Sequence, residues 1–199
     1  MLSISNAASG SAESVAVDDR ILEAAASCVA DFGVERVTLA EIARRAGVSR
    51  PTVYRRWPDT RAILASLLTD RIVGAWRQTA ARGSDRDALV GRIVEVAHHL
   101  RHDRVILHVF RSAPDLAMVY ITERLGTSQQ IVIDLVADEL RKAQSGNTVR
   151  AGDPHRLAAM VLLITQSTIQ SARIVEPILS ADALMTELTH ALNGYLRHG

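Results

Sequence analysis

The chain has 199 residues, of which 48% are hydrophobic and 23% are charged. This length suits one domain or two small ones, and this composition excludes an intrinsically disordered chain. The formal net charge is only +1, so charge becomes informative only where it is resolved by position. A single cysteine, Cys28, excludes an internal disulfide, and its place in an apolar helical pattern indicates a small buried side chain.

Residues 1–17 are rich in Ser, Ala, Gly and Asn and have no periodic apolar face, so we expect a flexible tail. No Lys or Arg precedes Arg20, whereas a secretory signal begins with positive charge. The longest apolar run, at residues 157–164, is far shorter than the roughly 20 residues of a membrane-spanning helix. We therefore expect a cytoplasmic protein that does not cross a membrane.

Apolar residues recur at spacings of three and four along almost the whole chain, which predicts an all-α fold of about nine helices. The first helix begins near Asp18 and ends before Gly33, a residue type common just after a helix. The second begins at Thr38. Glu41, three residues later, completes a predicted capping box in which each side chain accepts a backbone N–H.

Gly47 allows a sharp reversal after the second helix, because glycine adopts left-handed backbone angles at low cost. Ser49 caps a third helix over residues 50–57, whose first turn tolerates Pro51 and which ends at Pro58. Asp59 caps a fourth helix with an apolar stripe. Further helices are predicted over residues 85–102, 103–111, 114–142, 154–175 and 181–197, with a loop at 145–152.

Positive charge is concentrated around the second and third helices. Between residues 44 and 61, six arginines stand against Asp59 alone, a local charge of +5; they are Arg44, Arg45, Arg50, Arg55, Arg56 and Arg61. A run of charge by itself usually marks a solvated helix face. Here it falls on two short capped helices joined by a glycine turn, an arrangement that places a rigid helix in the major groove of DNA.

The same segment resembles the DNA-binding domain of the TetR (tetracycline repressor) family of transcriptional regulators. The resemblance covers roughly residues 18–64. It rests on Ile21-Leu22-Glu23-Ala24-Ala25, Phe32-Gly33, Val37-Thr38-Leu39, Ile42-Ala43, Ala46-Gly47-Val48-Ser49, Thr52-Val53-Tyr54 and Trp57-Pro58. It implies a helix-turn-helix domain of three helices at residues 18–64, after the tail at 1–17. Residues 65–199 would then form a helical domain for ligand binding and dimerisation.

By this resemblance, Thr38, Tyr54 and the start of the fourth helix would contact phosphates, and Arg50, Pro51, Thr52 and Arg55 would face base edges, with Ser49 beside them. Family members often carry a lysine near the start of the fourth helix, where this chain has Thr60 followed by Arg61. We therefore assign the phosphate role to Arg61. Arg44, Arg45 and Arg56 are expected to meet phosphates or to remain solvated.

The family pairs its last two helices with those of a second copy, which implies a homodimer through residues 154–175 and 181–197 and a palindromic operator in double-stranded DNA. The apolar residues available for this interface are Leu157, Met160, Val161, Ile164, Leu184, Leu188 and Leu192. Packing inside a single chain is the competing explanation for the same pattern.

The family also implies a small effector molecule, bound among the middle helices, that releases the DNA. Apolar candidates for its site are Trp76, Val96, Leu100, Phe110, Met118, Tyr120 and Ile121, and polar candidates are Gln166 and Gln170. The apolar character of the set favours a hydrophobic effector, although each residue could equally belong to the core.

His98 and His102 are spaced to share one helix face, but no cysteine or glutamate nearby completes a metal site, so we expect no metal and no cofactor. A proton or metal sensor is the minor alternative. Nucleophile elbows, phosphate-binding glycine loops, HExxH helices and paired cysteine motifs are not found in the sequence. The sequence therefore predicts a ligand-controlled repressor that is not an enzyme. The alternatives are a DNA-binding regulator without an effector and, distantly, a helical enzyme.

Overall fold

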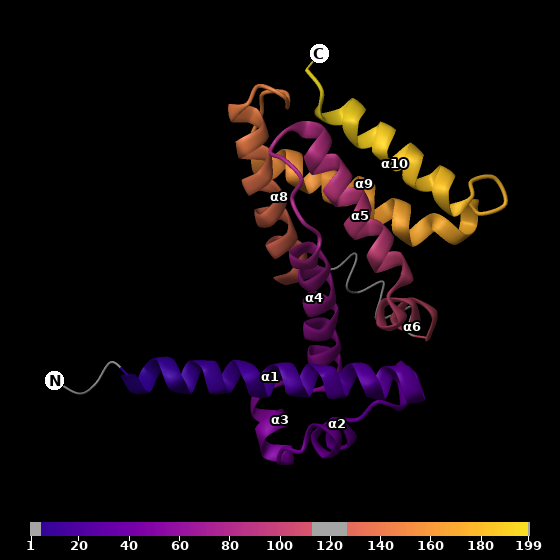
Figure 1. Cartoon of the computed structure of the whole chain (residues 1–199). Coiled ribbons are helices and arrows are strands. Elements are labelled where there is room, and N and C mark those ends of the chain that lie inside the picture. Colours follow the sequence, from indigo (N-terminus) through magenta and orange to yellow (C-terminus); the bar gives the residue numbers. More distant parts are fainter. Residues whose placement is uncertain (1–4, 113–126, 199) are drawn as a thin grey trace. The chain divides into compact units, whose positions relative to one another are not determined.

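The computed structural model describes the backbone of residues 5–112 and 127–198, and side chains at residues 14–109 and 129–198. Within these ranges the chain forms nine α-helices and one 3-10 helix and contains no strand, as predicted (Figure 1). The described helices fall into two compact units, which are treated separately below.

Unit 1 contains the first part of the chain, up to Leu68, together with α6. Its elements are α1 (Ser5–Phe32), the 3-10 helix η1 (Val34–Arg36), α2 (Leu39–Ala46), α3 (Arg50–Arg56), the start of α4 (Thr60–Gln78) and α6 (Arg104–Ser112). The α1 helix packs against α2, η1 and α6, and α2 packs against α3. The core includes fully buried side chains from α1, α2, α3 and α4, among them Ile21, Val29, Ile42, Val53 and Ile63.

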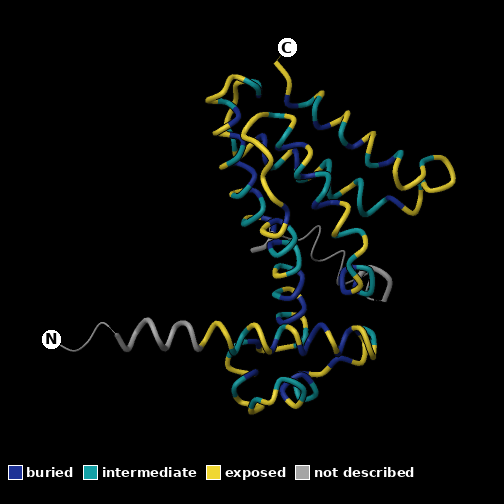
Figure 2. The backbone as a smooth tube through the Cα atoms, viewed as in Figure 1, coloured by how far each residue is buried: buried dark blue, intermediate teal, exposed yellow. Residues whose placement is uncertain are grey.

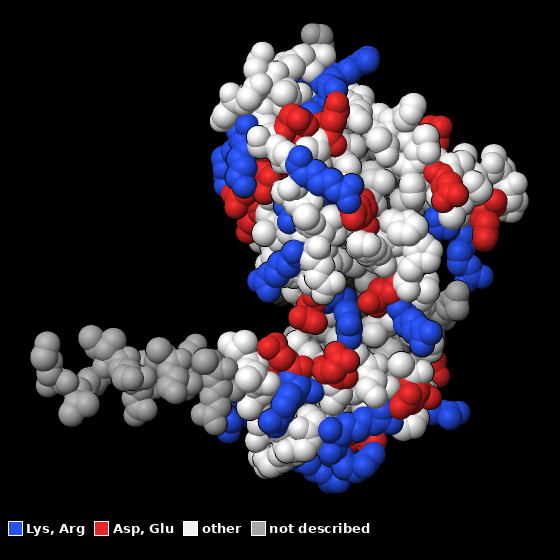
Figure 3. All heavy atoms as spheres, in the orientation of Figure 1, with Lys and Arg blue, Asp and Glu red and all other residues white. Residues whose placement is uncertain are grey.

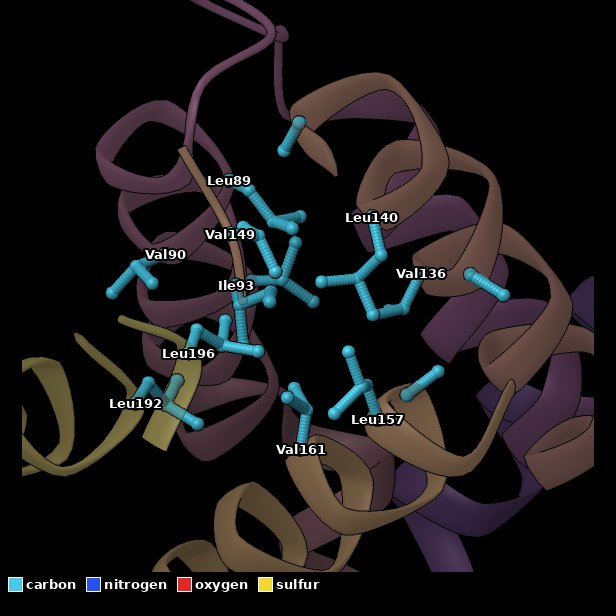
Figure 4. Packing of buried hydrophobic residues seen from close by; sticks show 14 of the residues in the cluster. Leu89, Val90, Ile93, Val136, Leu140, Val149, Leu157, Val161, Leu192 and Leu196 are labelled. Carbon is cyan, nitrogen blue, oxygen red and sulfur yellow. The ribbon is translucent and has the colours of Figure 1, made fainter. Parts of the chain in front are cut away.

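Unit 2 begins at Thr69 and contains the rest of α4, α5 (Arg86–His102), α8 (Thr127–Ser145), α9 (Pro154–Val175) and α10 (Ala181–Leu196). The α8 helix packs against α9, and α10 packs against both α5 and α9. Their apolar faces share one core, in which Leu89 and Ile93 of α5 point toward Leu140 of α8 and Leu157 of α9 (Figure 4).

The start of α1 differs from the prediction. The sequence predicts a flexible tail before a helix near Asp18, whereas α1 begins at Ser5 and includes residues 5–17. Ala7, Ala8, Ala12 and Ala16 have high helix propensity, and extending an existing helix costs far less than nucleating a new one. The absence of an amphipathic pattern therefore did not prevent helix formation here.

Most other predicted boundaries agree with the structure. The α9 helix covers the predicted range, α5 and α10 agree within one residue, and residues 146–152 form the expected loop between α8 and α9. The α6 helix begins and ends within one residue of the prediction. The predicted helix over residues 114–142 falls partly outside the described residues, which begin again with α8 at Thr127.

One described helix has the length and apolarity of a membrane span. The α9 helix has 22 residues and a mean hydropathy of 1.2 over its most apolar 18-residue window, of which 17% is buried. Uninterrupted apolar runs in the sequence did not indicate this, because polar residues divide the apolar ones along α9. Length and composition alone are a weak indication, because helices that pack in soluble proteins pass the same test.

Candidate nucleic-acid interface

The turn between α2 and α3 is held by side-chain caps and a glycine. Thr38 Oγ1 accepts a hydrogen bond from the Glu41 backbone N–H at 3.2 Å, and Ser49 Oγ accepts one from that of Thr52 at 3.2 Å. Between the helices, Gly47 has φ 64° and ψ 35°, the left-handed conformation that suits glycine. The Val48 N–H donates back to the Ala43 carbonyl at 3.1 Å. These bonds fix the reversal that was predicted at Gly47.

Only half of the predicted capping box is present. The Thr38 side chain caps α2 as expected, but the Glu41 carboxylate accepts hydrogen bonds from Arg44 Nη2 at 2.7 Å and Arg45 Nε at 3.1 Å. Bonds to a guanidinium are stronger than bonds to a neutral amide, which explains the choice of partner. Hydrogen bonds from Arg44, and then from Arg45, lower the pKa of Glu41 from 4.5 to about 2.

The α3 helix presents one polar face to solvent. Val53 is completely buried, while Arg50, Pro51, Tyr54 and Arg55 are exposed, with 52% of Tyr54 accessible (Figure 2). Four of the residues predicted to contact DNA therefore lie on the outward side of this helix.

The two other predicted residues around the start of α3, Ser49 and Thr52, are engaged with each other. Their hydroxyl oxygens lie 2.7 Å apart, in addition to the cap that Ser49 makes to the Thr52 N–H. Both hydroxyls are thus committed to holding the first turn of the helix.

The six arginines of this segment fall into two groups. Arg44, Arg45 and Arg56 form ion pairs with carboxylates of unit 1. The other three are exposed and form no hydrogen bond or ion pair with any residue that the structure describes; they are Arg50, Arg55 and Arg61. Figure 3 shows basic side chains gathered over the surface of the helix-turn-helix, where the sequence contains arginine and no lysine.

Arg45 and Arg56 are held against α1. Arg45 Nη1 donates to Asp31 Oδ2 at 2.6 Å, and its guanidinium lies 4.7 Å from the centre of the Phe32 ring. Arg56 Nε is paired with Asp18 Oδ1. The side chains of Arg45 and Arg56 are only 20% and 18% exposed. Neither is solvated, which was one of the two expectations from the sequence; the other was a contact with phosphates.

The end of α3 is tied to the start of α4. Trp57, which follows α3, is buried and donates from Nε1 to Ser66 Oγ at 2.9 Å. Asp59 Oδ1 accepts the Ala62 N–H at 2.8 Å, so it caps α4 as predicted. Arg61 lies exposed in the first turn of that helix.

Of the predicted effector residues, the structure brings only Leu100 to a described pocket. Trp76 and Val96 are buried in the core of unit 2, and Gln166 and Gln170 lie half-buried on α9. The side chain of Phe110, together with Met118, Tyr120 and Ile121, lies outside the described residues.

The pocket itself lies in unit 2, between α4 and the end of α5, and has a volume of about 230 Å³. Most of its wall is polar and was not anticipated from the sequence; besides Leu100 it includes Asp70, Arg71, Gln78, His99 and Asp103. The spacing of His99 and Asp103 in the sequence does place them about one helical turn apart. Only the folded structure shows that residues of α4 line the same pocket.

The histidines of α5 contact one another. The ring centres of His98 and His102 are 4.4 Å apart, and His102 Nδ1 lies 2.8 Å from the His98 carbonyl oxygen. Within the part of the chain that the structure describes, no three His, Cys, Asp or Glu residues are grouped so that they could hold a metal ion.

Cys28 lies in the interior of unit 1, in accordance with the sequence. Its side chain is fully buried, and burial raises the pKa of its thiol above 9.0. The thiol is therefore a poor nucleophile at neutral pH.

Residues 21–67 match the family model for bacterial regulatory proteins of the tetR family. The chain is also similar to an HTH-type transcriptional regulator of Mycobacterium tuberculosis. The two are 66% identical over 177 residues, which cover 89% of this chain and 93% of the relative. The family match includes α2, α3 and the first part of α4, and so it covers the exposed Arg50 and Arg55 of α3 and the exposed Arg61 of α4.

Solved structures share the fold at low sequence identity. The TetR-family repressor QsdR of R. erythropolis matches with a TM-score of 0.69 at 17% identity, covering 92% of this chain and 97% of its own. RolR, solved with its ligand resorcinol, matches with a TM-score of 0.67 at 17% identity, covering 94% and 90%. These structures contain the same two-part helical architecture.

Proposed function

Because the chain belongs to the TetR family of transcriptional regulators, we propose that it is a repressor that binds a palindromic operator as a homodimer and is released by a small effector. Its relatives are regulators and not enzymes, so the chain is a DNA-binding regulator by descent. We place it in the cytoplasm, where it would reach the chromosome.

The observation that carries the proposal is the outward face of α3. Arg50 and Arg55 are exposed there and have no partner among the described residues, so their guanidinium groups are available to an external anion or acceptor. An arginine on a helix in the major groove can donate two hydrogen bonds to guanine. We propose this role for Arg50 and Arg55, with Pro51 and Thr52 beside them.

Phosphate contacts would position this helix without reading sequence. We assign them to the Tyr54 hydroxyl, the exposed Arg61 in the first turn of α4, Thr38 at the start of α2, and Arg44. Arg44 is 71% exposed despite its pair with Glu41, so it can turn toward a phosphate. Ser49 would support the set by fixing the first turn of α3.

We propose dimerisation through α9 and α10, and the apolar surface that a single chain leaves uncovered on α9 supports the α9 part of this interface. Of the seven residues predicted for the interface, Leu157, Val161, Leu184, Leu188 and Leu192 are buried within the chain itself. Met160 remains exposed, and three further apolar side chains are exposed on or just after α9; they are Leu163, Ile174 and Ile178. Exposed apolar groups along one helix favour a protein partner.

A second copy accounts for this surface together with the DNA contact. Two reading helices related by twofold symmetry match half-sites about 34 Å apart, or a multiple of that distance. We therefore propose a palindromic operator with this spacing.

For the effector, we propose a small molecule that has an apolar part and several polar groups. Leu100 contributes an apolar wall to the pocket of unit 2, while Gln78, His99 and Asp103 offer hydrogen-bonding partners. The structural neighbour RolR holds resorcinol, an aromatic ring with two hydroxyls. An effector releases DNA only if it binds the DNA-free conformation more tightly than the DNA-bound one.

Recovery and sequencing of genomic fragments retained by the full-length protein would test the proposal. We expect enriched fragments that share an inverted repeat, and a gel-shift titration that shows specific binding to that repeat. Small molecules related to the products of adjacent genes would then be added to the complex. Fragments without a common repeat would refute the operator, and failure of every compound to weaken binding would favour a regulator without an effector.

A further inference from the structure

The α1 helix carries the same pair of side chains twice. Ser14 and Asp18 are four residues apart, and so are Ser27 and Asp31, so each pair lies on one helix face about one turn apart. Each pair receives one arginine from the helix-turn-helix.

Both members of each pair contact their arginine. Arg45 Nη1 donates to Ser27 Oγ at 2.7 Å and to Asp31 Oδ2 at 2.6 Å. Arg56 donates from Nε to Asp18 Oδ1 and from Nη2 to Ser14 Oγ at 3.4 Å.

The two attachments are far apart. Arg45 lies in the last turn of α2 and Arg56 is the last residue of α3, so each anchors the end of a different helix. Asp18 and Asp31 are 13 residues apart, which corresponds to about 20 Å along α1 at the rise of an α-helix. One attachment would let the pair of helices pivot on α1, whereas two separated attachments oppose that rotation.

Neither arginine keeps its donors free for DNA. Arg45 also donates to Glu41 and stacks on Phe32, and Arg56 Nη1 donates to the Thr52 carbonyl at 3.3 Å, near the end of α3. The side chains of Arg45 and Arg56 are mostly buried, whereas Arg50 is exposed.

We propose that Arg45 and Arg56, with their Ser and Asp partners on α1, form a two-point mount that sets the angle of α3 for operator binding. Arg45 and Arg56 are thus positioning residues and do not contact phosphates. This inference rests on the proposed DNA-binding function.

Substitution of Asp18, the partner of Arg56 on α1, distinguishes a positioning role of Arg56 from a phosphate contact. The two roles predict opposite changes in operator affinity. If Arg56 contacted a phosphate, Asp18→Asn would free it and remove a negative charge, so operator binding would tighten. If Arg56 is part of the mount, Asp18→Asn weakens operator binding by about fivefold, the contribution typical of one partly exposed ion pair.

Asp19→Asn is the matched control. It removes the same charge at the next position, where the side chain is exposed and forms no ion pair with a described residue. We expect it to bind the operator as tightly as the wild type or slightly more tightly. Asp18→Asn that binds as tightly as Asp19→Asn would overturn the mount.

Salt dependence gives a second readout. With Arg56→Gln, the slope of log K against log salt concentration should stay at the wild-type value while affinity falls, because no phosphate contact is lost. A phosphate contact would instead reduce the slope by about 0.9 for each protomer. A reduction of that size would contradict the mount.

Hydrogen exchange on the full DNA-free chain tests the mount without DNA. Asp18→Asn should speed exchange of the α3 amides and leave those of α10 unchanged, whereas unchanged α3 exchange would count against the mount.

If Asp18→Asn loses helical content, Ser14→Ala replaces it. The loss of one hydrogen bond should weaken operator binding about twofold, and wild-type affinity would count against the mount. A wild type that binds no operator would instead refute the proposed function, while the exchange result would still judge the mount.

Discussion

The helix-turn-helix and the α9 helix expose opposite kinds of surface. On α3 the outward side chains include Arg50 and Arg55, and the apolar Val53 is fully buried. On α9 the situation is reversed, because Leu163 is 60% exposed and Ile174 is 81% exposed. Exposed cations without an ion-pair partner favour binding to an anion, whereas exposed apolar side chains favour contact with another apolar surface.

This difference separates two kinds of partner within one chain. Within the helix-turn-helix, arginines that are available to DNA also lie close in sequence to arginines that are held in ion pairs. Arg55 and Arg56 are neighbours, yet the first points to solvent and the second is paired with Asp18 on α1. The number of arginines therefore overstates the number of contacts with DNA.

The largest expected effect concerns salt. If exposed arginines supply the contact, operator affinity should fall by about a thousandfold between 50 and 200 mM salt, because phosphate binding releases counterions. Fluorescence anisotropy with labelled operator at several salt concentrations would measure it. A nearly flat response would show that unpaired arginines do not dominate the contact with DNA, and would contradict the role assigned to the outward face of α3.

Arg50→Ala should weaken operator binding by about 10- to 100-fold, because it removes a bidentate contact to a base edge in each protomer. Tyr54→Ala should also weaken binding while the fold and the dimer persist. Gel-shift titration measures both. Arg77→Ala serves as the control, because Arg77 is an exposed arginine of unit 2 without an ion pair among the described residues. Equal losses for Arg50→Ala and Arg77→Ala would refute the assignment of α3 as the reading helix.

Leu163→Asp should weaken dimerisation by about tenfold or more, because a carboxylate would be buried without a partner in the apolar interface. Light scattering coupled to size exclusion, over a range of protein concentrations, would detect the dissociation. Val15→Asp is a matched control at an exposed apolar residue of α1. A Leu163→Asp protein that stays dimeric at every concentration would remove this face of α9 from the interface.

The smallest effect concerns the ion pairs that Glu41 forms within α2. Arg44 and Arg45 lower the pKa of Glu41 from 4.5 to about 2, so the folded state holds the ionised form more strongly than the unfolded state. This stabilisation is complete above pH 4.5 and is lost as the pH falls toward 2. Glu41→Gln should make the free energy of unfolding less dependent on pH between these values.

Urea unfolding at a series of pH values would measure the slope for Glu41→Gln. Glu35→Gln removes a carboxylate that is exposed and has no ion pair among the described residues, so it controls for the loss of charge alone. Identical slopes for the wild type and Glu41→Gln would show that the pair with Arg44 and Arg45 does not stabilise the fold.

Local signals predicted the elements well. Caps at Thr38, Ser49 and Asp153, and the turn at Gly47, depend on residues within five positions of one another, so they can be read from the sequence. The predicted start of α1 was wrong because residues 5–17 have helix propensity and form a helix without any apolar periodicity. The second half of the capping box failed because two arginines competed for the same carboxylate.

Partners distant in the chain could not be predicted. Asp18 and Arg56 are 38 positions apart, and Asp31 and Arg45 are 14 apart, so only the packing of α2 and α3 on α1 brings them together. The same limit applied to α9, where periodicity identified an apolar helix but could not separate Leu157 in the core from Leu163 at the surface.

The chain contains two tryptophans, and each unit holds one of them. The indole of Trp57 in unit 1 donates to Ser66, and that of Trp76 in unit 2 lies 4.1 Å beneath the guanidinium of Arg92. Both are buried, so each emission spectrum should shift to longer wavelength when its own unit opens to water. Replacing either indole with phenylalanine would leave a protein whose intrinsic fluorescence follows the unfolding of a single unit, without any added dye.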